Sequence, residues 1–239
     1  MTQDQYQHDS TRRDFLRHSA TGAAAFALLA SMNDQRTASA QTNERNTTMA
    51  KIKGTKTEQN LLKSFAGESQ ARNRYTLFAL KASEEGFEHI AAVFRETADQ
   101  EVIHAGEFFK YLETGEGVEI TATFPAGKVG TTEENLTAAA NGEREEWEQL
   151  YPQFAAIAKE EGFTDVSRTF TAVVVAEKQH EKRYRAFLEH LKAGDLFKRE
   201  NVVWRCRNCG FVVAAPSAPG VCAICKKPQG WFEILAENW

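Results

Sequence analysis

The chain has 239 residues, a net charge of −4 at pH 7 and 42% hydrophobic residues. This length allows one full-sized domain and one small domain, and the hydrophobic content is ordinary for a soluble globular protein. Lysine and arginine are scattered beyond the N-terminal segment, which argues against nucleic acid as a partner. The four cysteines all lie within the last 34 residues, a distribution that favours a metal site over a disulfide framework.

The N-terminal segment has the features of a targeting signal. Residues 11–17 are TRRDFLR, an alanine-rich run follows over 19–32, and Ala38-Ser39-Ala40 forms a small-x-small cleavage pattern. This order resembles a twin-arginine export signal and predicts a signal peptide over 1–40, a linker over 41–54 and a periplasmic location. The apolar run is shorter than the ~20 residues that span a bilayer, so we expect no stable membrane insertion. The alternatives are a polar tail with a chance arginine pair, and a second, cytoplasmic product that starts at Met49.

Helical periodicity dominates the middle of the chain. From 57 to 191 apolar residues recur at helical spacing, which predicts four long helices. Thr55 and Glu58 form a plausible capping box for the first. Gly86 and Gly162 stand where two helices should stop, and the others should begin near Phe87, Thr132 and Phe163. Residues 114–131 contain glycines and a proline without periodicity, which predicts a long crossover between the second and third helices.

The helical region repeats itself with a shift of 76 residues. The shift pairs Glu84-Glu85-Gly86-Phe87 with Glu160-Glu161-Gly162-Phe163, and it also pairs Tyr75 with Tyr151. Several matches at one shift indicate a duplicated helical hairpin. Two such hairpins predict a four-helix bundle with an internal pseudo-twofold axis, in which paired residues face one another.

Two Glu-x-x-His motifs obey the same repeat. Glu101 and His104 pair with Glu177 and His180. Residues three apart project from one helix face, so each motif can offer an oxygen and a nitrogen to one metal. Either motif alone would be read as a solvated helix face; their equivalence in the repeat favours a metal site.

A di-iron carboxylate bundle also needs a carboxylate from each remaining helix. The first helix offers Glu68 and the third offers Glu143, with Glu146 one turn later. Glu68 precedes Tyr75 by seven residues, whereas Glu143 precedes Tyr151 by eight. The extra residue predicts a π-bulge between Glu143 and Tyr151, aided by the proline that follows.

The charges in this set require compensation. Five ionised carboxylates in a core would be prohibitively costly without metal or protons. Oxygen ligands with imidazole and no sulfur suit iron or manganese. Tyr75 and Tyr151 are candidates to hold the ligating carboxylates by hydrogen bonds, or simply to satisfy polar groups of the core.

The C-terminal segment carries two Cys-x-x-Cys pairs twelve residues apart, Cys206 with Cys209 and Cys222 with Cys225. Four thiolates at this spacing can surround one metal tetrahedrally. About 38 residues are too few for a sufficient apolar core, so the metal should supply the folding energy. Trp204, Phe211, Trp231 and Phe232 should form an aromatic shell. The spacing alone does not separate iron from zinc, and a zinc ribbon is the alternative.

The motifs together resemble those of the rubrerythrin family. The resemblance rests on residues 65–75 (FAGESQARNRY), 96–101 (ETADQE), 176–183 and 204–210 (WRCRNCG), and it covers the chain from Met49 to Trp239. It implies a mainly α, ferritin-like four-helix bundle over 55–194, a linker over 195–201 and a small rubredoxin-like domain with β-strands and metal knuckles over 202–239. Rubrerythrins are usually described as cytoplasmic, so the export signal leaves compartment and electron donor open.

The resemblance also implies cofactors, partners and chemistry. It implies two non-haem irons held by Glu68, Glu101, Glu143, Glu146, Glu177 and His180, with His104 as an alternative ligand to one iron, and a mononuclear iron on the four cysteines. It implies reduction of hydrogen peroxide to water, electrons from a reductase or a rubredoxin-type donor, and homodimers in which one subunit's cysteine site approaches the other's di-iron site.

Redox chemistry gives Glu146 and His104 competing roles. Anionic oxygen should be preferred by ferric iron and neutral imidazole by ferrous iron, so we expect one iron to exchange these ligands on turnover. Two rival functions remain open. The first is a ferroxidase or iron-storage protein, since similar ligands can oxidise ferrous iron with oxygen; the second is a binding or scaffold protein with a structural zinc ribbon.

Overall fold

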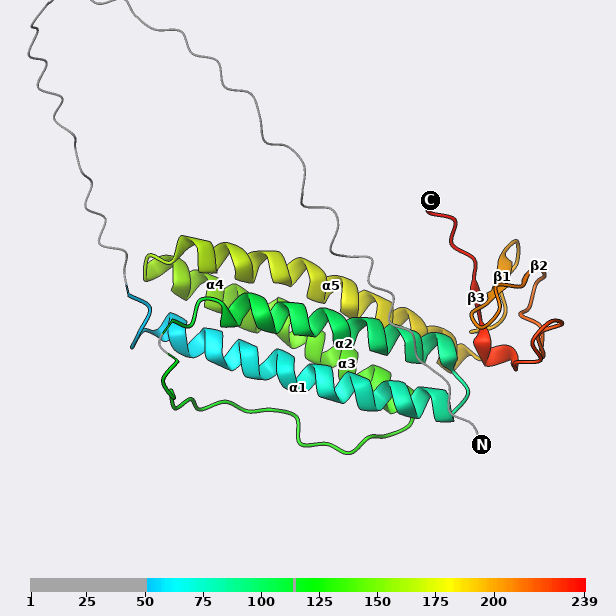
Figure 1. Ribbon diagram of the computed structural model, residues 1–239, viewed down its shortest axis with the longest axis horizontal. Coiled ribbons are helices and arrows are strands. Elements are labelled where there is room, and N and C mark those ends of the chain that lie inside the picture. Colours follow the sequence, from blue (N-terminus) through cyan, green and yellow to red (C-terminus); the bar gives the residue numbers. More distant parts are fainter. Residues whose placement is uncertain (1–50, 114) are drawn as a thin grey trace, which may run out of the picture. The chain divides into compact units, whose positions relative to one another are not determined.

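The computed structural model describes residues 51–113 and 115–239, and its larger part is a bundle of long helices (Figure 1). The bundle contains α1 (Lys56–Glu84), α2 (Glu88–Phe109), α3 (Thr132–Glu145), the π-helical segment η1 (Glu146–Leu150), α4 (Tyr151–Glu160) and α5 (Thr164–Ala193). α1 packs along α2, and α5 packs along α3 and α4. An extended crossover joins the two hairpins, which confirms the predicted four-helix bundle.

The start of α1 uses a variant of the predicted cap. The Thr55 side chain accepts a hydrogen bond from the Glu58 N–H at 3.1 Å. The Glu58 carboxylate accepts from the Gly54 N–H, because the Thr55 N–H already donates to the Ile52 carbonyl. One half of the predicted capping box is therefore present, and the other half is displaced by one residue.

The remaining helix ends follow the sequence signals. Gly86 and Gly162 have φ angles of +84° and +89°, a backbone conformation that glycine adopts without a Cβ penalty. α3 begins with a complete capping box, in which Thr131 and Glu134 bond to each other's backbone N–H groups. α1 and α4 therefore end at equivalent positions of the repeat.

The predicted helical irregularity lies where the register requires it. η1 occupies Glu146–Leu150, between Glu143 on α3 and Tyr151 at the start of α4. Its wider turn accommodates the one residue by which this half of the bundle exceeds the other. Pro152 follows in the first turn of α4, where its missing N–H costs least.

The bundle core is divided into two apolar clusters. One contains Tyr75, Phe78, Phe94, Leu136 and Tyr184, among others. The second contains Leu61, Phe108, Tyr151, Val166 and Phe170, among others. A buried glutamate lies between the two clusters on α1, α2 and α5 and near the end of α3. A polar layer thus crosses the middle of the bundle.

The C-terminal module is a small three-stranded antiparallel sheet in the order β2-β1-β3. β1 spans Val203–Cys206, β2 spans Val212–Ala214 and β3 spans Phe232–Ile234, with the 3-10 turn η2 (Gln229–Trp231) before β3. Trp204 and Phe232 are buried, and Phe211 and Trp231 pack against them. The expected aromatic shell is present.

The predicted signal peptide over 1–40 and residues 41–50 of the linker lie outside the described residues. Within residues 51–113 and 115–239, the longest helices lack an apolar stretch sufficient to cross a membrane.

Candidate metal centres

Each side of the bundle contributes one carboxylate to the polar layer. Glu68 comes from α1, Glu101 from α2, Glu143 from α3 and Glu177 from α5. None of them exposes more than 1% of its surface. Four carboxyl groups at this depth must share protons or bind cations, because their burial and mutual repulsion oppose ionisation.

The ligand atoms form two overlapping groups. In one, Glu68, Glu101, His104 and Glu177 bring one atom each to within 4.8 Å of one another; in the other, Glu101, Glu143, Glu177 and His180 do the same. Glu101 and Glu177 belong to both groups. A carboxylate has two oxygens, so two shared carboxylates can bridge two neighbouring cations.

His104 faces the first group. Its Nδ1 lies 2.8 Å from Glu101 Oε2 and 2.9 Å from Glu177 Oε1. Burial by itself would lower the pKa of His104, but hydrogen bonds and charge from these two carboxylates outweigh burial and raise the pKa to about 10. The pKa of this imidazole thus depends strongly on the negative charge of the site. The same charge would attract a metal cation.

His180 faces the second group and is held from behind. Its Nδ1 lies 2.8 Å from Glu177 Oε2, and its Nε2 lies 2.9 Å from the side-chain oxygen of Gln100. Burial disfavours the cation, but the surrounding glutamates raise the pKa of His180 to about 12. The sequence motifs did not predict a role for Gln100. Its neighbour Glu101 was the available signal, but only the packing of α2 against α5 shows that the amide reaches His180.

The two tyrosines of the repeat cross the bundle reciprocally. Tyr75 on α1 donates a hydrogen bond of 2.5 Å to Glu143 on α3, and Tyr151 on α4 donates to Glu68 on α1. Both hydroxyls are buried with their rings in the apolar clusters. Each tyrosine therefore orients a carboxylate of the opposite hairpin that belongs to only one ligand group.

The carboxylates retain free acceptor capacity toward the centre. One oxygen each of Glu68, Glu101, Glu143 and Glu177 accepts no hydrogen bond of good geometry. Burial and the neighbouring carboxylates hold the pKa of Glu68 and of Glu143 well above the usual range. Hydrogen bonds from the two histidines overcome burial at Glu177 and lower its pKa to about 2. Orphaned oxygens and two imidazoles form a donor set that fits iron or manganese.

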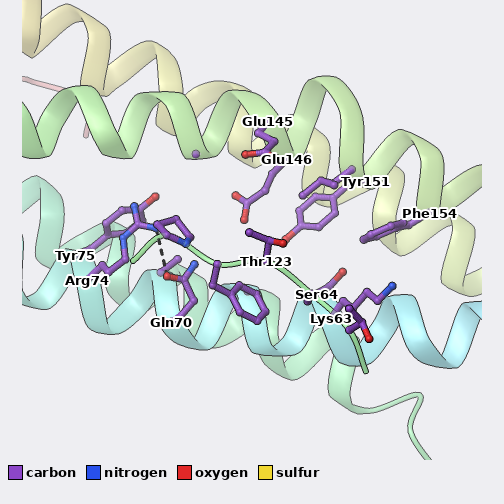
Figure 2. Close-up of a pocket in the computed structure, with 18 residues that line it drawn as sticks. Lys63, Ser64, Gln70, Arg74, Tyr75, Thr123, Glu145, Glu146, Tyr151 and Phe154 are labelled. Carbon is purple, nitrogen blue, oxygen red and sulfur yellow. Dashed lines mark hydrogen bonds between the residues drawn. The ribbon is translucent and has the colours of Figure 1, made fainter. Parts of the chain in front are cut away.

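Glu146 stands apart from both groups. It is half-buried in η1, and it lines a pocket between α1 and α4 (Figure 2). Burial and the charges of Glu143, Glu177 and Glu101 raise its pKa well above the usual range, so it senses the site electrostatically. Of the two side chains expected to alternate, His104 thus lies within ligand distance of the others and Glu146 does not.

The four cysteines converge at the edge of the C-terminal module. All four Sγ atoms lie within 4.8 Å of one another, with Cys206 3.7 Å from Cys225 and Cys209 3.5 Å from Cys222. A tetrahedral metal with bonds of about 2.3 Å holds its sulfurs roughly 3.8 Å apart, so the spacing fits. Gly210, at φ +76°, makes the turn after the first pair.

The thiols of this group are unequal. A hydrogen bond from the Lys227 backbone N–H is the main reason that the pKa of Cys225 falls to about 6. The pKa of Cys209 rises to about 12, because burial and the neighbouring cysteines outweigh a backbone hydrogen bond from Phe211. A thiolate at Cys225 can start metal binding, and the cation then displaces the proton of Cys209.

Comparison with known proteins decides the family. The rubrerythrin family profile matches residues 59–188, and the profile of the rubrerythrin rubredoxin-like domain matches residues 204–233. The chain belongs to the rubrerythrin family. It is 53% identical over 189 residues to a rubrerythrin from Porphyromonas gingivalis, covering 79% of this chain and 94% of that one. A rubrerythrin from Nitratidesulfovibrio vulgaris is 49% identical over 192 residues, covering 80% and 100% of the two chains.

Solved structures agree with this assignment. Nigerythrin in its fully reduced, all-ferrous state superposes with a TM-score of 0.52 at 31% identity, covering 77% of this chain and 91% of that one. A bacterioferritin from Mycobacterium tuberculosis, at 20% identity and a TM-score of 0.50 over 57% and 86% of the two chains, shares the fold alone. The predicted ferritin-like fold class is confirmed.

The rubrerythrin family binds a di-iron centre in the bundle and a mononuclear iron on four cysteines. This chain presents a buried carboxylate–histidine set for the first and four converging thiols for the second. The expected cofactors are therefore confirmed at the level of the family. The individual ligands remain predictions, supported by the distances above.

Proposed function

We propose that this chain is a non-haem di-iron peroxidase that reduces hydrogen peroxide to water in defence against oxidative stress. The observation that carries the proposal is the pair of overlapping ligand groups that share Glu101 and Glu177. Shared carboxylates would hold two metal ions side by side, and a pair of ferrous irons would supply two electrons together. Reduction of peroxide consumes two electrons and two protons and breaks one O–O bond, so a two-electron site avoids release of a radical.

The protein orients the ligands through groups behind them. Tyr75 and Tyr151 hold Glu143 and Glu68 by their hydroxyls, and Gln100 holds the far nitrogen of His180. We infer that these contacts keep one half of the centre rigid while His104 and Glu146 alternate at the other half. Neutral imidazole suits the reduced centre and the anionic carboxylate suits the oxidised one.

The cysteine module would deliver the electrons. Within one chain, His89 near the start of α2 contacts Glu233 of β3 at 3.5 Å. His89 lies 12 residues before Glu101, a rise of about 18 Å along an α-helix. A second copy that brought its own module to the middle of this bundle would shorten that path. We therefore propose a homodimer, with a reductase or rubredoxin-type protein as external donor.

We further propose that the chain is exported by the twin-arginine route. The proposal rests on the sequence of residues 11–40. This route carries folded proteins, so iron could be inserted before the thiols meet an oxidising compartment. Fractionation should find a processed protein that starts near Gln41 in the periplasm. Full-length protein confined to the cytoplasm would contradict it, and a product starting at Met49 would support the cytoplasmic alternative.

Metal analysis and turnover test the activity. We expect three irons per chain, a visible absorption from the ferric cysteine site, and faster turnover with hydrogen peroxide than with oxygen. Zinc in the cysteine site without visible absorption would support the zinc-ribbon alternative, and a preference for oxygen with ferrous iron would support a ferroxidase.

A cysteine variant separates the two centres. Cys225→Ser should retain oxidation of the reduced di-iron centre by a single equivalent of peroxide but lose steady-state turnover, because the electron supply is broken. Cys225→Ser with wild-type steady-state turnover would contradict the role of the module.

A further inference from the structure

A pocket of about 400 Å³ lies beside the bundle site, between α1 on one side and α3, η1 and α4 on the other (Figure 2). Residues 121–125 of the crossover cover it. Ligand pockets commonly measure about 300–1,000 Å³, whereas a water molecule takes about 30 Å³ of liquid volume. Hydrogen peroxide, with two oxygens, needs on the order of twice the share of a water. The pocket is far larger than that substrate requires.

The pocket borders residues that adjoin the metal site. Its lining includes Glu146, Tyr75 and Tyr151, and the hydroxyls of these two tyrosines hold Glu143 and Glu68. In Figure 2 the carboxylate of Glu146 and the side chain of Tyr151 both extend from the helices above toward the pocket. A molecule in the pocket would therefore have one end next to the reacting centre.

The rest of the lining combines apolar side chains with polar and charged ones such as Lys63, Arg74 and Glu145. Phe124 from the crossover, Leu150 from η1 and Phe154 from α4 contribute side chains to it. Ser64 also lines the pocket; it is only 3% exposed, and its hydroxyl has no hydrogen-bond partner. A buried hydroxyl without a partner costs free energy, which a polar atom of a ligand would recover.

Two glycines keep the pocket open. Gly67 and Gly142 both line it, and each directly precedes a site carboxylate. A Cβ added at Gly142 would meet nothing within 4 Å, and one at Gly67 would meet only the Phe124 ring at 4.0 Å. Glycine inside a helix costs about 1 kcal/mol relative to alanine, so packing does not explain either residue.

We propose that this pocket binds compact organic hydroperoxides as substrates. The inference rests on the proposed peroxidase function and assigns its substrate class. The apolar group would lie among Phe124, Leu150 and Phe154, with the peroxide group toward Glu146. The reduced di-iron centre would supply two electrons, and solvent would supply two protons. The O–O bond breaks, the organic part leaves as an alcohol and the terminal oxygen leaves as water.

Gly142→Leu tests the proposal by filling the pocket. Gly106→Leu is the matched control, since Gly106 is an exposed glycine within α2 and an added Cβ there also meets nothing within 4 Å. Gly142→Ala and Ser64→Ala are milder variants that should fold even if Gly142→Leu does not. Iron content and thermal unfolding are measured for each variant before comparison.

The first readout is independent of activity. Binding of 2-phenyl-2-propanol, the redox-inert alcohol product of cumene hydroperoxide, is followed by calorimetry. The wild type and Gly106→Leu should bind it equally, Gly142→Leu should bind at least tenfold more weakly, and Ser64→Ala a few-fold more weakly. Absence of binding to the wild type, or equal binding by all variants, overturns the proposal.

The second readout is the ratio of kcat/KM for cumene hydroperoxide to that for hydrogen peroxide. The ratio should fall at least tenfold in Gly142→Leu and remain unchanged in Gly106→Leu. Turnover of hydrogen peroxide without any turnover of cumene hydroperoxide overturns this inference alone. An equal loss with both peroxides also overturns it, because the substitution would then act on the metal site. Failure of the wild type with hydrogen peroxide itself overturns the proposed function.

Discussion

The hairpin of α1 and α2 and the hairpin of α3, α4 and α5 each bring one carboxylate, one Glu-x-x-His pair and one tyrosine to the same layer. They differ around those ligands. The second hairpin contains η1 and Glu146, and its His180 is held by Gln100, whereas His104 of the first has no such tether among the described residues. The shared part defines where two cations fit. We expect the unequal part to give the site a rigid side and a side free to change ligands.

The shared carboxylates should be equivalent, and their loss should have the largest effect. Glu101→Gln and Glu177→Gln each remove a charge that both ligand groups use. We expect either variant to lose bundle iron and at least about 100-fold in peroxide turnover, more than is typical for residues behind the ligands. Iron content and kcat/KM measure this. A variant that keeps both bundle irons would break the assignment of that carboxylate as shared.

Deletion of Gln149, an exposed residue of η1, would give the second hairpin the seven-residue spacing of the first. Glu146 would then occupy the position equivalent to Ala71, which packs in an apolar cluster. A buried carboxylate there is costly, so we expect a clear fall in the unfolding temperature. Adding Glu146→Ala to the deletion should restore stability and iron content while peroxide turnover stays low. A stable, fully active single deletion would show that η1 has no role.

The two histidines should respond unequally to substitution. His180→Ala removes a side chain held by Glu177 and Gln100, and we expect loss of an iron with about 100-fold lower turnover. His104→Ala should retain both bundle irons in the oxidised protein, with about tenfold slower turnover, because Glu146 can replace it only in one state. Iron content and single-turnover kinetics distinguish the two variants. Equal effects would remove the distinction between a rigid and a changeable side.

Gln100→Leu should have a smaller effect on the same side. The substitution leaves His180 Nε2 without its partner at 2.9 Å. Residues that orient a ligand in this way typically contribute about 10- to 100-fold to metal affinity, and we expect the lower end of that range. Competition with a chelator measures the change, and Gln100→Glu, which restores an acceptor, should recover most of it. Unchanged affinity in Gln100→Leu would indicate that the contact only satisfies the imidazole.

The metal-free bundle should lose stability as pH rises. Burial raises the pKa of Glu68, Glu143 and Glu146, and their carboxylate neighbours raise the pKa of His104 and His180 to about 10 and about 12. The folded chain therefore holds more protons than the unfolded chain. The stability that these groups contribute is fully present below their unfolded pKa values, about 4.5 for the glutamates and about 6.5 for the histidines, and is lost as the pH rises above them.

Urea unfolding of the chelator-treated protein at pH 5, 7 and 9 tests this dependence. The midpoint should fall from pH 5 to pH 9, and iron should reverse the trend, because the metal binds deprotonated ligands. Below pH 4.5 the midpoint should also fall as the pH decreases. Glu177 has a lowered pKa, so its protonation in this range removes its contribution to stability. A midpoint independent of pH would contradict the charge balance of the site.

Much of this site can be predicted from the sequence because the two halves of the repeat can be compared position by position. The unequal spacing of Glu68–Tyr75 and Glu143–Tyr151 predicted η1, and the pairing of Glu101 with Glu177 predicted a shared layer. Side-chain direction was not readable in the same way. The reach of Gln100 to His180 and the turn of Glu146 toward the pocket depend on helix packing and on the path of the crossover.

The unequal roles of His104 and Glu146 are tested most directly by crystal structures of the reduced and oxidised protein with iron located by anomalous diffraction. The reduced protein should have His104 as a ligand and Glu146 facing the pocket, and the oxidised protein should have Glu146 as a ligand and His104 released, with His180 bound in both. The same ligands on both irons in the two states would contradict the account.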